Sequence, residues 1–522
     1  MRDFHFPGRS SVVGKNGMCA TSHPIASKVA VDMMTSGGNA VDAAIAAALV
    51  LGIAEPAMTG IGGDCFFLVK PAGSETLVGL NGSGRAPAGL DAGSLRAAGH
   101  KEMPAYDVNA VSIPGALDAM IKMAADYGSR DLAEILAPCI HYAEEGIPVA
   151  PRVAFDWADM PGQMTGAAAK YYLHGGKAPK VGDLFRAPGQ AEVLRRVAQS
   201  GRAGFYEGEV AQDMVDTLQA AGGVHTLDDF AATACDYVEP ISGTYRDIEL
   251  VELPPNGQGA TAILLANILS NFDIASLEPN GALRVHLEAE ATKLAYDARN
   301  RFVADPTPRL DHMLSKATAD ELAALIDPDL VMPSATEVSE SVHKETIYIT
   351  VVDKDRMAVS LIYSIFHGFG SRIASDKFGV MFQNRAAGFT LEQGHPNEAA
   401  GGKRPMHTII PGMIRKAGKV IMPFGVMGGQ YQSAGHARFI SNIADFGMDP
   451  QAAIDAPRSF PQDGFLDVER GYSDAVRSEL SAMGHDVRIP DVAIGGAQAI
   501  RIDDEVLVGG SDPRKDGCAL GY

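Results

Sequence analysis

The sequence predicts a fold that mixes α-helices and β-strands, and three stretches indicate it. Residues 346–352 are all β-branched or aromatic, which is typical of a β-strand. Residues 39–54 consist mainly of Ala, Val, Ile and Leu, which predicts a helix buried on most sides. Residues 282–302 predict a second long helix. Composition alone supports no finer assignment than mixed α and β.

The length, composition and net charge of the chain indicate its number of domains and the kinds of partner that it can have. With 522 residues it exceeds the ~150 residues of one simple domain, which suggests two or three domains. Hydrophobic residues make up 46% and charged residues 21%, as in globular proteins. The net charge of −20 argues against nucleic acid or an anionic membrane as the main partner.

The cysteines and the amino terminus indicate the compartment. The five cysteines are scattered and show no Cys-x-x-Cys spacing, so we expect buried free thiols and neither a disulfide framework nor a metal site. We expect no cofactor. The first residues lack a basic start followed by an apolar core, and the longest apolar run, residues 43–54, is too short to span a bilayer. We therefore expect a cytoplasmic protein.

Local signals place the first helices. A helix is expected over residues 25–35, ended by the glycine pair at Gly37. Asn39 can cap the next helix, with Asp42 three residues later supporting its first turn. Pro56 should stop that helix.

A glycine-rich segment follows, with two interpretations. Residues 60–63 (Gly-Ile-Gly-Gly) could belong to a dinucleotide-binding loop. The third glycine has the wrong spacing, however, and a strand rather than a helix is expected next. A tight turn between buried elements is the favoured interpretation.

The strand at residues 346–352 begins directly after a long polar segment. Residues 327–345 before it are polar and rich in turn-forming residues, which predicts an exposed loop. Residues 353–356 supply turn chemistry, and residues 357–365 form a second apolar run, so a hairpin is expected. A threonine such as Thr346 at the head of a buried strand is usually structural.

Motifs along nearly the whole chain alter that interpretation. Matching segments occur at residues 16–18, 37–44, 60–63, 113–115 and 254–259, and in the strand itself at Thr346, Val351, Val352, Asp353, Ala358 and Val359. Together they resemble the γ-glutamyltranspeptidase family of N-terminal-nucleophile hydrolases. The resemblance implies a four-layer αββα sandwich formed jointly by two fragments. It also implies self-cleavage between Glu345 and Thr346, giving a large fragment 1–345 and a small fragment 346–522.

The resemblance implies a catalytic group as well. In such an enzyme the new α-amine of Thr346, with a pKa of roughly 7.7–8.0, takes the proton of its own hydroxyl. Ser364 matches a hydroxyl residue that hydrogen-bonds the nucleophile. Gly428 and Gly429 match two glycines whose N–H groups hold the oxyanion. The alternatives are an ordinary strand serine and an ordinary glycine turn.

Substrate recognition departs from the family pattern. The arginine that binds a glutamyl α-carboxylate is replaced by Ser83. Arg85 lies two residues later and could replace it only if this glycine-rich loop shifts. The acids that hold the α-amine are missing beside Arg385, and a Ser-Ser pair is replaced by His407 and Thr408. These departures resemble a subgroup that includes oxamate amidohydrolase and glutathione-hydrolase-like proteins. Arg385 is expected to bind a carboxylate of the substrate, to which His407 could donate a hydrogen bond. Arg385 could instead form a structural ion pair, and His407 could be a satisfied core histidine.

Three functional hypotheses follow. The first is a self-processing amidohydrolase or acyltransferase that acts on amides of small carboxylate-bearing acids, γ-glutamyl-like or oxamate-like, with a glutathione hydrolase or transpeptidase proper as the alternative. The second is a non-catalytic binding protein of the same fold, and the third is a dinucleotide-dependent enzyme. The expected partners are a small amide substrate and the chain's own two fragments as a heterodimer, with further dimerisation open.

Overall fold

A computed structural model describes residues 5, 8–332 and 347–522 of the chain. Within these residues most strands belong to two seven-stranded sheets. The first sheet has, in spatial order, β1 (Val12–Gly14), β18 (Leu507–Ser511), β17 (Gly496–Ile502), β13 (Lys419–Met427), β12 (Gly412–Lys416), β9 (Ile248–Glu252) and β8 (Ile241–Tyr245). The second has β19 (Cys518–Gly521), β2 (Met18–Thr21), β10 (Ile347–Val352), β11 (Ala358–Ser364), β3 (Asp64–Lys70), β4 (Val78–Gly82) and β7 (Asp236–Val238).

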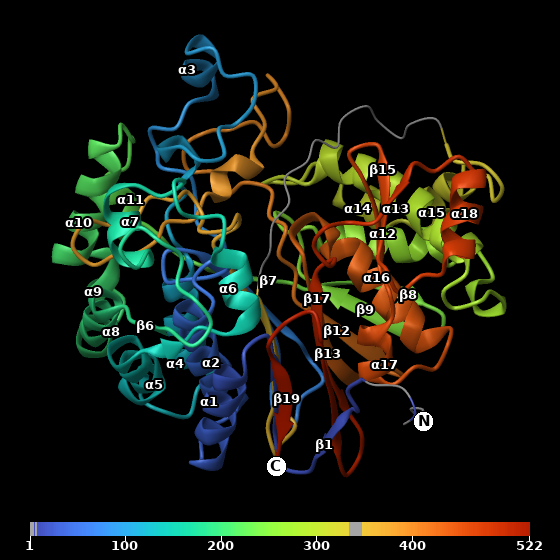
Figure 1. Ribbon diagram of the computed structural model, residues 1–522, viewed down its shortest axis with the longest axis horizontal. Helices are drawn as coiled ribbons and strands as arrows, with labels where there is room; N and C mark the ends of the chain where they lie inside the picture. Colours follow the sequence, from blue (N-terminus) through green and yellow to red (C-terminus); the bar gives the residue numbers. More distant parts are fainter. Residues whose placement is uncertain (1–4, 6–7, 333–346) are drawn as a thin grey trace.

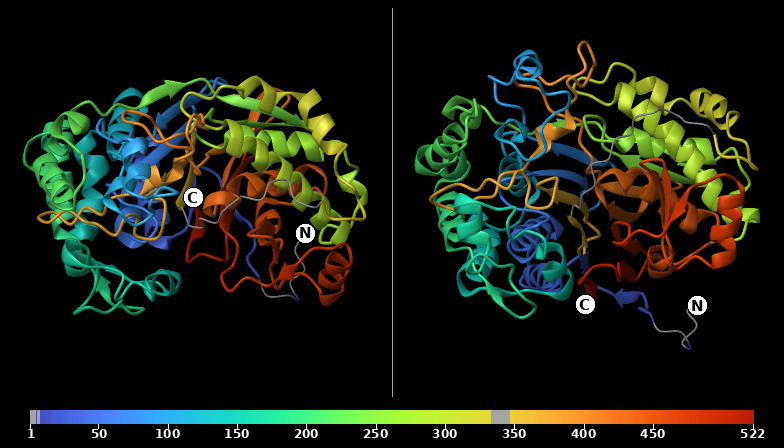
Figure 2. Two further views of the ribbon diagram at one scale, coloured as in Figure 1. Left: turned by 90° about the horizontal axis from the view of Figure 1, so that it is seen from above. Right: turned by 45° about the horizontal axis from the view of Figure 1, so that its top comes forward.

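Helices form two groups. The group beside the second sheet includes α1 (Pro24–Thr35), α2 (Ala40–Ala54), α4 (Ala116–Tyr127), α5 (Leu132–Glu145), α6 (Pro151–Trp157), α7 (Gly166–Tyr172), α8 (Pro188–Ser200), α9 (Ala203–Tyr206), α10 (Gly208–Ala220) and α11 (Leu227–Ala231). The group beside the first sheet includes α12 (Gly259–Leu269), α13 (Ala282–Phe302), α14 (Leu310–Leu314), α15 (Lys316–Ala323), α16 (Gln432–Ala444), α17 (Pro450–Asp455) and α18 (Asp474–Ala482). Figures 1 and 2 show the two groups on opposite sides of the strands.

Shorter elements complete the described chain. They are α3 (Ala92–Ala97), the 3-10 turns η1 (Val108–Ala110), η2 (Ile274–Ser276), η3 (Arg385–Gly388) and η4 (Gly429–Tyr431), the pair β5 (Ile147–Pro148) and β6 (Leu184–Phe185), and the small sheet β14 (Ser459–Gln462), β15 (Phe465–Val468) and β16 (Val487–Arg488).

Three buried clusters show how the layers pack. Side chains from both sheets, such as Phe66 and Ile362 from one and Val251 and Met413 from the other, form a core between the sheets. A second cluster joins α1, α2, α4, α5 and α8 to the outer face of the sheet that holds β10. A third joins α12, α13 and α16 to the outer face of the other sheet. The mixed α and β prediction is therefore confirmed, with two sheets face to face and helices outside.

Each large sheet combines strands from both sides of the expected cleavage point. In the sheet that holds β10, the strands β10, β11 and β19 follow residue 346, whereas β2, β3, β4 and β7 precede it. The other sheet is mixed in the same way. Neither part of the chain could leave without breaking both sheets.

The local predictions near the amino terminus are confirmed. Asn39 caps α2 by accepting hydrogen bonds from the N–H groups of Val41 and Asp42, and the Asp42 carboxylate accepts one from the Asn39 N–H at 2.9 Å. All fifteen residues of α2 are buried. The predicted hairpin is also present, because β10 and β11 pair antiparallel from Ile347 with Tyr363 to Val352 with Ala358.

The dinucleotide hypothesis is not supported. β3 follows the glycine-rich segment directly and pairs antiparallel with both β4 and β11. In the described residues both large sheets are antiparallel throughout, whereas a dinucleotide fold requires a parallel βαβ unit.

All five cysteines are free thiols. None of the helices in the described ranges is long and apolar enough to cross a membrane.

Candidate active site

The expected nucleophile lies at the edge of the described chain. Thr346 and Glu345 both fall outside the described residues. The strand that follows Thr346 lies inside its sheet, between β2 and β11. Ser364, the last residue of β11, is fully buried, and its Oγ accepts a hydrogen bond from the Phe366 N–H at 2.9 Å.

Arg385 extends the polar group around Ser364. Its guanidinium donates hydrogen bonds to Ser364 Oγ at 3.3 Å and Thr408 Oγ1 at 3.1 Å, and it lies 4.1 Å above the ring of Phe366. Arg385 is completely buried, and burial lowers its pKa to about 9. No carboxylate in the described ranges forms an ion pair with it, so the structural ion-pair interpretation finds no support there.

A buried carboxylate that the sequence analysis missed lies beside this group. Asp64 begins β3 and pairs with Ser364 across the ladder. Its Oδ1 accepts hydrogen bonds from the N–H groups of Gly84 at 2.8 Å and Gly115 at 3.1 Å, and from Gln383 Nε2 at 2.8 Å. Asp64 directly follows the glycine-rich segment at residues 60–63, so its position after that turn was the available signal.

His407 is held by the protein itself. Its Nδ1 accepts a hydrogen bond from the Ile409 N–H at 3.3 Å, so its Nε2 carries the proton and donates to Asp64 Oδ2 at 3.2 Å. Burial, reinforced by the Arg385 cation, lowers the pKa of His407 to about 3. Since both ring nitrogens are engaged, the satisfied core histidine is the interpretation that the geometry favours. In this structure the N–H that could donate to a substrate carboxylate is donated to Asp64.

Ser83 and Arg85 take different positions. Ser83 is buried, and its Oγ accepts a hydrogen bond from Asn256 Nδ2 at 3.1 Å. The Arg85 side chain is 43% exposed and forms ion pairs with Asp236 and Asp305, each at 3.4 Å. Arg85 therefore makes no contact with Arg385 or Ser364 among the described residues, and it does not take the place of the lost arginine in this structure.

The glycine turn expected to hold an oxyanion follows β13. Gly428 has φ of 122° and Gly429 has φ of 55°, both in the left-handed region that favours glycine. A Cβ at Gly428 would lie 2.9 Å from the Cα of Gly495, which excludes a side chain. The carbonyl of Gly428 accepts from the Tyr431 N–H, and within the described part of the chain neither glycine N–H has an acceptor of its own.

Gln258 connects that turn to Arg385, and the sequence analysis missed it too. The buried Gln258 Nε2 donates to the carbonyl of Gly429 at 3.1 Å and to the carbonyl of Thr408 at 2.7 Å. The Thr408 hydroxyl in turn accepts from Arg385. One network of side chains therefore joins Ser364, Arg385, Thr408 and the glycine turn.

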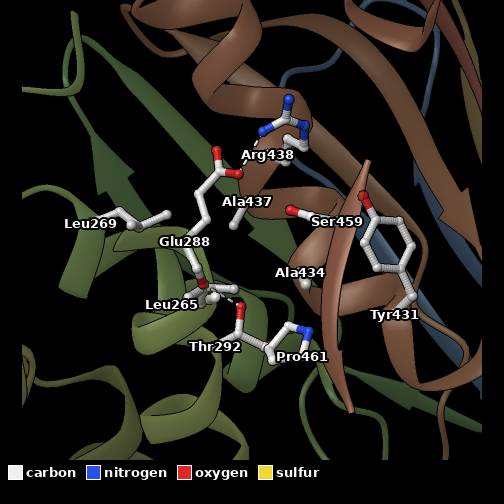
Figure 3. Close-up of a pocket in the computed structure, with 11 residues that line it drawn as sticks. Leu265, Leu269, Glu288, Thr292, Tyr431, Ala434, Ala437, Arg438, Ser459 and Pro461 are labelled. Carbon is white, nitrogen blue, oxygen red and sulfur yellow. Dashed lines mark hydrogen bonds and ion pairs between the residues drawn. The ribbon is translucent and has the colours of Figure 1, made fainter. Parts of the chain in front are cut away.

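A small enclosed space lies behind the turn. Tyr431, two residues after Gly429, lines it together with Ser459 and with Glu288, whose carboxylate pairs with Arg438 at 2.5 Å (Figure 3). Its volume of about 10 Å³ is room for at most one water molecule. This space is therefore too small for a substrate.

Comparison with known proteins gives matches along nearly the full chain. Residues 26–522 match the family described as Gamma-glutamyltranspeptidase. The chain is 34% identical to the glutathione hydrolase-like YwrD proenzyme of Bacillus subtilis (strain 168), over 98% of this chain and 99% of that protein. It is 31% identical to the oxamate amidohydrolase proenzyme of Klebsiella pneumoniae subsp. pneumoniae, over 98% of this chain and 100% of that protein.

A solved structure is similar over the same extent. The crystal structure of cephalosporin acylase from Bacillus halodurans superposes with a TM-score of 0.93 at 37% sequence identity. The match covers 100% of this chain and 99% of that chain.

Proposed function

We propose, given that this chain belongs to the gamma-glutamyltranspeptidase family, that it is a self-processing amidohydrolase with Thr346 as its nucleophile. The matched relatives make it a hydrolase proenzyme of that family. Cleavage between Glu345 and Thr346 would leave fragments 1–345 and 346–522. They would remain together as a heterodimer in a four-layer sandwich, because both sheets contain strands from each fragment.

The proposed reaction uses the new amino terminus. The α-amine of Thr346 takes the proton of its own hydroxyl, and the oxygen attacks the amide carbon of the substrate. The amine of the substrate leaves with a proton, and an acyl-enzyme ester forms on Thr346. Water then attacks the ester and releases the acid, which restores the threonine.

Two described parts support these steps. Ser364 ends the strand next to β10, directly after Tyr363, the partner of Ile347, which supports the proposal that its hydroxyl orients the nucleophile. The N–H groups of Gly428 and Gly429 would stabilise the oxyanion of each tetrahedral intermediate. The Gln258 hydrogen bond to the Gly429 carbonyl keeps this turn in place.

The observation that carries the substrate assignment is that the buried cation of Arg385 forms no ion pair with a carboxylate in the described ranges. A buried charge without a paired counterion is destabilising, and the hydroxyls of Ser364 and Thr408 and the more distant Asp64 carboxylate offset this only in part. A carboxylate on the acyl group would supply the missing counterion through charge-assisted hydrogen bonds. We therefore assign amides of small carboxylate-bearing acids, such as oxamate, as the substrate class.

A γ-glutamyl group fits this site less well. It carries an α-ammonium as well as an α-carboxylate, and the acids that hold the ammonium in glutathione-cleaving relatives are replaced by Ala387 and Gly388. A buried ammonium without a partner costs several kcal/mol. Glutathione should therefore be a poor substrate.

Steady-state kinetics test the proposal. The processed protein is assayed with oxamate, a γ-glutamyl anilide, glutathione and a cephalosporin, the last because a cephalosporin acylase is similar in structure. We expect the highest kcat/KM with the small acid amide. A kcat/KM for glutathione above about 10⁴ M⁻¹s⁻¹, which is typical of a good enzyme, would refute the assignment.

A further inference from the structure

Two histidines and a glutamate form a buried cluster away from the candidate active site. His286 and Glu290 lie one helical turn apart on α13, and His485 follows α18. All three are buried, and one ligand atom from each lies within 4.8 Å of the others. Figure 1 shows α13 and α18 on the same side of the molecule, in the lobe outside the first sheet.

The hydrogen bonds of His286 fix its ring in the orientation and tautomer that are common for metal-binding histidines. Its Nε2 donates to the carbonyl of Asp327 at 2.7 Å, so its Nδ1 has a lone pair. That lone pair faces Nε2 of His485 at 2.8 Å. Metal-bound histidines commonly donate their second N–H to a backbone carbonyl, which fixes the tautomer and the ring. Here the carbonyl of Asp327 has this role.

The third group supplies a negative charge. Glu290 Oε1 accepts a hydrogen bond from Lys293 at 2.6 Å, and Oε2 accepts one from the Met332 N–H at 2.7 Å. Because a carboxylate has about four lone-pair sites, these two bonds leave acceptor capacity for a cation.

A cavity next to the cluster provides space and access. It has a volume of about 350 Å³ and is lined by His485, Lys293 and Met332, among others. A space of this size and polarity holds water. An ion could enter through it, and one of its water molecules could complete the coordination.

We propose that His286, Glu290 and His485 form a binding site for a divalent cation of the zinc class. Two imidazole nitrogens and one carboxylate oxygen are a ligand set that Zn²⁺ uses together with water. The ion would replace the proton shared between the two rings, and that proton would be released. With Zn–N bonds of about 2.0–2.1 Å the nitrogens must separate to about 3.3 Å, a small outward shift from 2.8 Å toward the cavity.

The site is independent of the proposed hydrolysis, and it differs from the expectation, drawn from the sequence, that the chain has no metal site. The two histidines are separated by 199 residues, and no spacing motif links them. The expectation of no metal site rested on the cysteine pattern, which bears only on thiolate ligands. Both Asp327 and Met332 belong to the segment that precedes residues 333–346, so metal binding would also fix the end of that segment.

Titration with Co²⁺ tests the proposal by a readout other than enzyme activity. The full-length protein without a polyhistidine tag is treated with a chelator, desalted and titrated while visible absorption is recorded. We expect one Co²⁺ per chain with the intense absorption of a four- or five-coordinate ion. ZnCl₂ should displace it and raise the midpoint of thermal unfolding, because a ligand of the native state stabilises it.

Variants locate the ion. His485→Gln and Glu290→Gln should weaken Co²⁺ binding about 10- to 100-fold or more, since even supporting groups contribute that much. His312→Gln, which changes a histidine on α14 of the same lobe, should bind as the wild type does. Absence of stoichiometric Co²⁺ binding to the wild-type protein overturns the proposal even if a variant fails to fold. Equal affinity in the two ligand variants and the wild type overturns it as well.

Discussion

Replacement of Arg385 by glutamine separates binding of the acyl carboxylate from the rest of the chemistry. Arg385→Gln retains an N–H donor near Ser364 and Thr408 but removes the charge. Loss of one partner of a buried, hydrogen-bonded charge pair costs about 2–5 kcal/mol. At 1.4 kcal/mol for each factor of ten, kcat/KM for the acid amide should fall from about 30-fold to a few thousand-fold.

The same variant should leave the stability of the protein and its self-cleavage almost unchanged. Because the buried cation forms no ion pair in the described ranges and Asp64 acts on it only from a distance, its removal should change the free energy of unfolding little, and self-cleavage before Thr346 should continue. The assay compares kcat/KM for the acid amide with kcat/KM for an amide of equal size without a carboxylate. Equal losses for the two substrates would refute the role in carboxylate binding.

Arg85→Gln is the matched control. Arg85 was the other candidate for the lost arginine, but it is partly exposed and pairs with Asp236 and Asp305. Exposed ion pairs contribute about 0.2–1 kcal/mol, so kcat/KM should change by less than about fivefold. A loss as large as that of Arg385→Gln would show that Arg85 binds the substrate.

Three further predictions concern the surrounding network. Since burial lowers the pKa of Arg385 to about 9, the cation is lost above that pH, and kcat/KM for the acid amide should fall there while that for the uncharged amide does not. Asp64→Asn replaces one carboxylate oxygen by an NH₂ group, which then faces N–H groups that now donate to Asp64. Each donor left without an acceptor should lower the free energy of unfolding, measured in urea titrations, by about 1–3 kcal/mol; an unchanged midpoint would contradict this. Gln258→Leu frees the carbonyl of Gly429, so kcat should fall by up to about 100-fold with little change in KM, and a change in KM alone would argue against a positioning role.

Local features could be predicted from the sequence because their causes are local. The alternation in residues 346–352 and the turn at residues 353–356 predicted the β10–β11 hairpin. Asn39 and Asp42 predicted the start of α2, since both partners of the capping box lie within one helical turn. The glycine turn at Gly428 has the backbone angles that its composition indicated.

The rest of the site depends on contacts between distant segments. Asp64 and His407 are 343 residues apart, and only the pairing of β3 with β11 and the path of the chain near Asn256 bring them together. The spacing of the two residues in the sequence does not indicate such a contact. The same reason explains why Gln258 was missed.

The two arginine candidates show most clearly what could not be predicted from the sequence. Arg85 lies two residues from the position of the lost arginine, whereas Arg385 lies far away in sequence. The fold places Arg85 against surface carboxylates and Arg385 against Ser364. Proximity in the sequence therefore could not distinguish the two, whereas burial and contacts favour Arg385.

The mass of the purified protein tests the central claim most directly. Intact-mass and amino-terminal analysis of the wild-type protein should give two fragments, residues 1–345 and 346–522, the second with threonine as its first residue. Thr346→Ala should give one uncut, inactive chain, and Thr346→Ser should retain part of both activities because a hydroxyl remains. A wild-type protein that hydrolyses its substrate as a single 54.9 kDa chain, or a Thr346→Ala variant that still cuts itself and turns over substrate, would contradict the account.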